Sequence, residues 1–233
     1  MKNTKIVNTI KSINNICEVS GDIKPEHSFK VVFSGESAVG KTSIIKQETI
    51  KEFNSQYQMT TCFDHSYKNF EIGDTIIRIQ IWDTSGQELY KSLILNFYRS
   101  SLLAFVVFAL DDINSFEKCE NWLKEVRNLA CDDIPIFLIG NKSDKKEDRQ
   151  IKQEIIDKFV NDNNITYYCE CSAMNGDGID KVFKEAIRCL YNTYVVPTLN
   201  NKLLNGYTDE ESKTFELKDT RYKSNCKECL CCE

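Results

Sequence analysis

The chain lacks the excess of basic residues that general nucleic-acid binding needs, since 30 lysines and arginines face 35 acidic residues, a net charge of −5. It also lacks a long hydrophobic run, because its longest, Leu102 to Leu110, is too short to cross a bilayer as a helix. No stretch near the start has the apolar core of a signal peptide. Its 41% apolar and 28% charged residues are typical of a globular protein, which we expect to be intracellular.

Apolar and amphipathic stretches alternate along most of the 233 residues. We expect strands at 29–34, 66–72, 75–82, 102–109, 135–140 and 166–171, and helices at 41–53, 88–97, 114–130, 150–162 and 178–194. Such alternation predicts a mainly parallel sheet with helices on both faces. Gly73 and Asp74 join the second and third strands as an antiparallel hairpin, so we expect one antiparallel edge strand.

Three parts of the chain differ in composition. Residues 1–28 are polar and rich in Asn and Lys, and we expect a flexible extension there. Residues 29–196 hold the apolar runs of one globular domain. Pro197 should stop the last helix, and residues 197–233 should form a flexible tail.

A complete phosphate loop, G-x-x-x-x-G-K-[ST], spans residues 35–42. It follows an apolar run and precedes a helical pattern, as the motif requires. Its glycines let successive backbone N–H groups turn towards a polyphosphate, at the N-terminus of the helix that follows. Lys41 would reach the β- and γ-phosphates, and the Thr42 hydroxyl would hold Mg²⁺.

Polar residues also follow three other predicted strands, at the edge where an open parallel sheet binds ligands. Asp83 could hold Mg²⁺ through a water molecule. The alternative is that Asp83 is a turn residue that caps the helix expected at 88–97. Asn141-Lys142-Ser143-Asp144 suits guanine, because the Asp144 carboxylate can accept from both the ring N1–H and the exocyclic amine. Residues 171–174, Cys-Ser-Ala-Met, follow the last strand. We therefore predict one composite nucleotide site.

Taken together, these motifs resemble the Ras superfamily of small GTPases and, in detail, its Rab branch. The likeness runs from Phe29 to about Leu190. It is carried by the phosphate loop, Ile81-Trp82-Asp83-Thr84-Ser85-Gly86-Gln87-Glu88, Phe97-Tyr98-Arg99, Ser115-Phe116 with Trp122-Leu123, and Gly140-Asn141-Lys142-Ser143-Asp144. The resemblance implies a three-layer P-loop NTPase G domain with a six-stranded mixed sheet, binding of GTP or GDP with Mg²⁺, and two switch segments that the γ-phosphate orders.

The resemblance also assigns roles to single residues. The nucleotide would contact Glu36, Ser37, Ala38, Val39, Gly40, Lys41, Thr42, Ser43, Phe53, Tyr57, Thr60, Gly86, Asn141, Lys142, Asp144, Ser172, Ala173 and Met174. The metal would be held by Thr42, Thr60 and Asp83, and Gln87 would orient the attacking water.

Some positions depart from the family pattern. Thr61-Cys62 replace the usual Ile-Gly after Thr60, so Thr61 is an alternative for the switch I role. His65 stands where Rab proteins usually have a Phe that joins Trp82 and Tyr98 in an effector-facing triad. A surface histidine explains this position more simply than a pH switch does.

No arginine lies in the phosphate loop or switch I, so we expect slow intrinsic hydrolysis and a GTPase-activating protein that supplies one. A GTP-binding scaffold that never hydrolyses is an alternative, motivated by the unusual residues after Thr60. We expect a monomer that works with an exchange factor and effectors.

Four of the eleven cysteines, Cys226, Cys229, Cys231 and Cys232, lie within the last eight residues. The C-C-X ending resembles the doubly geranylgeranylated termini of Rab proteins, which would place lipids on Cys231 and Cys232. A single lipid group gives only marginal, reversible membrane binding, so stable attachment needs a second lipid group or another signal. The resemblance then implies an escort for prenyl transfer, an extractor of the GDI type, and the cytoplasmic face of intracellular membranes. Zinc binding by Cys226-x-x-Cys229 is an alternative that lacks a second pair of ligands.

Overall fold

The computed structural model describes residues 16–21, 23–55, 63–84, 98–130 and 133–199. Its strands are β1 (Ile16–Val19), β2 (His27–Ser34), β3 (Phe63–Ile72), β4 (Thr75–Thr84), β5 (Leu103–Ala109), β6 (Ile136–Asn141) and β7 (Tyr167–Glu170). Its helices are α2 (Lys41–Thr49), α4 (Ile113–Glu117), α5 (Cys119–Leu129), α6 (Gln153–Asp162) and α7 (Ile179–Leu190), followed by a π-helical turn, η2 (Tyr191–Val195).

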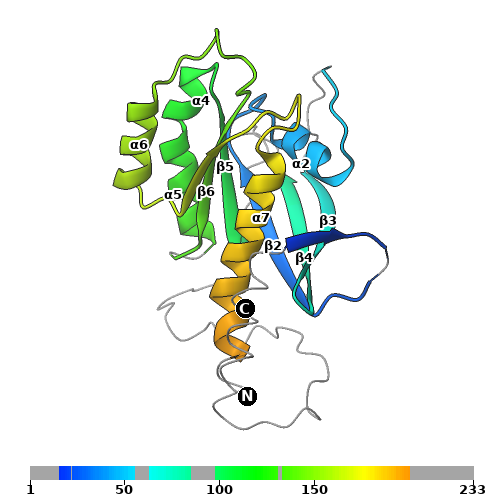
Figure 1. Cartoon of the computed structure of the whole chain (residues 1–233). Coiled ribbons are helices and arrows are strands. Elements are labelled where there is room, and N and C mark those ends of the chain that lie inside the picture. Colours follow the sequence, from blue (N-terminus) through cyan, green and yellow to red (C-terminus); the bar gives the residue numbers. More distant parts are fainter. Residues whose placement is uncertain (1–15, 22, 56–62, 85–97, 131–132, 200–233) are drawn as a thin grey trace, which may run out of the picture.

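One twisted sheet runs through the molecule in the order β1-β3-β4-β2-β5-β6-β7 (Figure 1). Five neighbouring strands pair in parallel, in the order β4-β2-β5-β6-β7, and β3 runs antiparallel to both of its neighbours, β1 and β4. The mixed, mostly parallel α/β fold is therefore confirmed. The antiparallel strand is second from the edge rather than at the edge.

The expected number of six strands is wrong, because β1 adds a seventh within the segment predicted to be an extension. Its four residues pair antiparallel with residues 69–72 of β3, from Ile16 opposite Ile72 to Val19 opposite Asn69. Only Ile16 is buried. So short a strand carries almost no pattern of its own, and it forms because β3 offers an unpaired edge.

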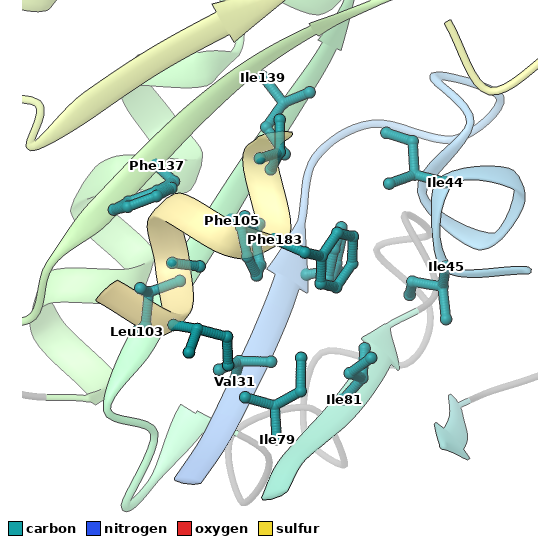
Figure 2. Packing of buried hydrophobic residues seen from close by; sticks show 14 of the residues in the cluster. Val31, Ile44, Ile45, Ile79, Ile81, Leu103, Phe105, Phe137, Ile139 and Phe183 are labelled. Atoms are coloured by element: carbon teal, nitrogen blue, oxygen red, sulfur yellow. The ribbon is translucent and has the colours of Figure 1, made fainter. Parts of the chain in front are cut away.

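Helices cover both faces of the sheet, as Figure 1 shows. One hydrophobic cluster lies between the sheet and helices α2 and α7, and Figure 2 shows its centre around Phe105 and Phe183. The second cluster lies between the sheet and helices α4, α5 and α6. Strand β5 is buried along its whole length, which explains its continuous apolar sequence.

Several helices differ from their predicted bounds: α2 ends at Thr49 instead of residue 53, and α6 begins at Gln153 instead of residue 150. The helix expected at 88–97 lies outside the described residues. The helix expected at 114–130 is divided into α4 and α5, and its cap is Asp112, whose side chain accepts from the Asn114 N–H. Pro197 does not end the last helix, because helical conformation continues through it to Leu199. The π turn ends with the Val196 N–H donating to the Tyr191 carbonyl, so Pro197 lies in the first turn of the helical segment 196–199, where its missing N–H is tolerated.

Candidate nucleotide-binding site

The phosphate loop leaves β2 at Gly35 and enters α2 at Gly40. Both glycines have a positive φ, of 138° and 97°. A Cβ on Gly35 would lie 2.2 Å from the Val107 carbonyl oxygen, and one on Gly40 would lie 2.2 Å from Nδ2 of Asn141. The loop therefore needs glycine at these two positions both for its backbone conformation and for its close approach to β5 and β6.

Lys41, the first residue of α2, is buried beneath this loop. Its Nζ donates to the backbone carbonyls of Gly35 at 2.8 Å and of Glu36 at 2.7 Å. Burial lowers its pKa to about 8, and the nearby Asp83 carboxylate partly opposes that shift. A phosphate placed in the loop would supply the negative charge that this buried ammonium lacks.

Thr42 and Asp83 form the second polar group of the site. The Thr42 hydroxyl donates to Oδ2 of Asp83 at the end of β4. Asp83 is almost fully buried, and its other oxygen, Oδ1, has no hydrogen-bond partner in the described part of the chain. Burial raises the pKa of this carboxyl group, with the Thr42 hydrogen bond opposing. A buried carboxylate oxygen without a partner, beside a hydroxyl group, suits Mg²⁺, which prefers oxygen ligands.

Asn141 connects three loops at the carboxyl end of the sheet. Its Nδ2 donates to the Val39 carbonyl of the phosphate loop at 2.8 Å. Its Oδ1 accepts from the Ala173 N–H at 3.1 Å. Both contacts are buried, so one side chain fixes the phosphate loop, the end of β6 and the loop after β7 relative to each other.

The remaining residues expected at the base lie around Asn141. The Ser172 hydroxyl donates to Oδ1 of Asp144, which orients that carboxylate. Lys142 has a positive φ of 67°, and its Nζ lies 3.1 Å from Oδ1 of Asp111. Met174 is 60% exposed. The geometry therefore brings the Asn-Lys-x-Asp segment, the loop after β7 and the phosphate loop into one site.

Comparison with known proteins agrees with this geometry. The model of the Ras family matches residues 30–192. The chain is also 30% identical, over 197 residues, to the Ras-related protein RABA6b of Arabidopsis thaliana, an alignment that covers 84% of this chain and 86% of the relative.

The chain belongs to the Ras family of small GTPases. Small GTPases of this family bind guanine nucleotide with Mg²⁺ and hydrolyse GTP, and the likeness to RABA6b makes this one Rab-like. Among the residues that the structure describes, none of the helices has the length and apolar character needed to cross a membrane.

Several residues assigned from the resemblance lie outside the described part of this small GTPase. They are Tyr57, Thr60 with its alternative Thr61, Gly86, Gln87 and the terminal cysteines Cys231 and Cys232. Among the described ones, Phe53 is 42% exposed after α2, Ser37 and Ala38 are exposed, and Ser43 is half-buried in the first turn of α2.

The aromatic triad expected to face effectors is not a surface triad. Tyr98 is fully buried, and its hydroxyl lies 2.9 Å from the Ser34 hydroxyl. His65 is exposed and packs against Trp82, with ring centroids 4.8 Å apart. The face of this small GTPase therefore presents His65 and Trp82 without the tyrosine.

Sequence reasoning missed three partners of the site. Asp111, after β5, binds the ammonium groups of Lys142 and Lys145. Lys118 and Trp122 hold the side chain of Glu36 in the phosphate loop. An acidic residue after a buried strand could have pointed to Asp111, but nothing local links residue 36 to residues 118 and 122.

Proposed function

We propose that this small GTPase is a molecular switch of intracellular vesicle trafficking, which recruits effectors to a membrane while it holds GTP. The observation that carries this proposal is the convergence of the phosphate loop, the Asn-Lys-x-Asp segment and the loop after β7 on the Asn141 side chain. In this arrangement Lys41 would bind the phosphates and Asp144 the guanine edge. Thr42 and Asp83, with Thr60 from switch I, would hold Mg²⁺, which neutralises charge on the phosphates.

Hydrolysis would be slow without a partner. Gln87 would orient the attacking water, but no arginine stands in residues 35–62 to stabilise the charge that develops on the phosphates. Intrinsic turnover of such a site is on the order of 10⁻⁴ to 10⁻³ s⁻¹. A GTPase-activating protein would supply the arginine, and an exchange factor would release GDP.

Membrane attachment would come from geranylgeranyl groups on Cys231 and Cys232, delivered by an escort protein and shielded by an extractor of the GDI type. Six basic residues against seven acidic ones in residues 198–233 leave no polybasic patch to assist a single lipid. Two lipids would therefore be needed for stable binding.

Replacing Asp144 by alanine tests the nucleotide assignment. We expect Asp144→Ala to bind guanine nucleotide more weakly by at least about 2 kcal/mol, roughly thirtyfold in the dissociation constant. The ring N1–H and the exocyclic amine of guanine would then lose their charged acceptor. Competition of GDP and ADP against fluorescent GDP measures this preference. Ser172→Ala is the matched control, since it removes only the hydroxyl that orients the carboxylate and should cost less. An unchanged preference for guanine in Asp144→Ala would contradict the proposed base site.

Replacing Gln87 by leucine tests the proposed hydrolysis. In single-turnover assays with extracts or purified activating proteins, we expect stimulated GTP cleavage in the natural chain. Its loss in Gln87→Leu should reach at least about a hundredfold, with GTP binding retained, because the attacking water is no longer oriented. Stimulated cleavage that survives in Gln87→Leu would assign the role to another residue. A chain that binds GTP and is never stimulated would favour the non-hydrolysing scaffold.

A further inference from the structure

The second residue of the phosphate loop, Glu36, sends its side chain away from the loop to helix α5. Oε2 accepts from Nζ of Lys118 at 2.8 Å, just before that helix. Oε1 accepts from the indole Nε1 of Trp122, one turn into it, at 3.1 Å. Both carboxylate oxygens are thus held by donors more than 80 residues further along the chain.

The two donors differ in their setting. Trp122 is 6% exposed and packs in the hydrophobic cluster that α5 shares with the sheet, so its N–H is a fixed point. The Lys118 side chain is 56% exposed and supplies a positive charge at the rim. One partner therefore sets the direction of the carboxylate, and the other neutralises it.

The direction of the Glu36 side chain is important because the backbone of Glu36 lies at the phosphate site. The Glu36 carbonyl accepts from Nζ of Lys41 at 2.7 Å. A carboxylate that turned back towards the loop would pair with this buried ammonium, and it would repel the phosphates of a nucleotide. The contacts with Lys118 and Trp122 place the carboxylate on the α5 side. Burial first, and the charge of this carboxylate second, raise the pKa of the Cys119 thiol, and the same charge also opposes the lowering of the pKa of Lys41 by burial.

We propose that Lys118 and Trp122 are positioning residues for the nucleotide, which hold the Glu36 carboxylate away from the phosphates and so slow nucleotide release. The inference rests on the proposed function, because it needs a polyphosphate in the loop. The time for which the nucleotide stays bound would then depend on residues at helix α5, which need not touch the nucleotide themselves.

The test measures the release of fluorescent GDP from the full chain into excess unlabelled GDP. We expect Lys118→Met to speed release about five- to tenfold, because it leaves the carboxylate without its charged partner. Trp122→Phe, which keeps an aromatic ring in the core, should speed release about threefold, less than Lys118→Met, because the carboxylate then keeps its charged partner. Lys124→Met is the matched control on the same helix, since its ammonium pairs with Glu120 at 2.7 Å on the surface, and it should release GDP at the natural rate.

The decisive variant is Lys118→Met combined with Glu36→Gln. Because Glu36→Gln removes the unpaired negative charge, release from the double variant should return to within about twofold of the natural rate. If the two substitutions only disturbed the structure, their effects would add, and the double variant would release GDP faster than Lys118→Met alone. Natural release rates in both Lys118→Met and Trp122→Phe would overturn the inference, and so would a double variant as fast as Lys118→Met. If the natural chain itself retained no guanine nucleotide, the proposed function would fall together with the inference.

Discussion

Replacement of Asn141 by alanine is expected to weaken guanine-nucleotide binding by about a hundredfold or more. The change leaves the Val39 carbonyl and the Ala173 N–H without their partner, although both contacts are buried. Each unpaired buried group costs about 1–3 kcal/mol. The three loops would also no longer be held in one relative position, so the nucleotide would have to order them when it binds.

Isothermal titration with GDP, together with thermal unfolding with and without the nucleotide, separates affinity from stability. Asn163→Ala is the matched control, because Nδ2 of Asn163 also donates to a backbone carbonyl, that of Phe159, but at the end of α6. We expect the control to bind GDP as the natural chain does. An Asn141→Ala variant whose dissociation constant stayed within about threefold would show that the loops converge without this side chain.

The succession of strands and loops along residues 29–171, though not the added strand β1, could be predicted because the central strands have apolar sequences that stand out locally. Strand β5, for example, is buried at every residue, and β6 ends on the asparagine of the guanine motif. The family was likewise predictable, since its motifs are short, contiguous strings. Where the sequence decides the outcome within a few residues, sequence and structure agree.

Contacts between distant residues could not be predicted in this way. Glu36 reads as one polar residue of a loop, and only the fold shows that Lys118 and Trp122 hold it. Strand β1 has four residues and needs the edge of β3 to form. Helix α4 begins at Ile113, one residue before its predicted start, because the turn after β5 places Asp112 at the N-cap.

Lys68 is the clearest case of a residue whose role depends on the fold. From the sequence, a lysine in this strand would be expected to face solvent, but the Lys68 side chain on β3 is only 5% exposed. Nζ lies 2.6 Å from Oε1 of Glu48 on α2 and 2.8 Å from Oε2 of Glu18 on β1, and it also donates to the Glu48 carbonyl at 2.7 Å. One ammonium group thus joins the added strand, the interior of the sheet and the helix that follows the phosphate loop.

Replacing Lys68 by methionine is expected to lower the free energy of unfolding by about 3–5 kcal/mol at pH 7, because it leaves the buried Glu48 carboxylate without its main partner. Burial already raises the pKa of Glu48 against the opposing effect of Lys68. A carboxyl group whose pKa is higher in the folded state costs stability as the pH rises from its unfolded pKa towards its folded one. The loss in Lys68→Met should therefore be smaller at pH 5 than at pH 7.

Urea unfolding of the GDP-bound chain at these two pH values measures both effects. Lys68→Met combined with Glu48→Gln should recover most of the stability, since no buried charge then remains between α2 and β3. Lys124→Met, which breaks an exposed pair with Glu120 within α5, should change little. A loss under about 1 kcal/mol at pH 7 would mean that Glu48 is hydrated or neutral once Lys68 is gone. The joint between β1, β3 and α2 would then be held by its backbone pairing and apolar contacts, and not by the lysine.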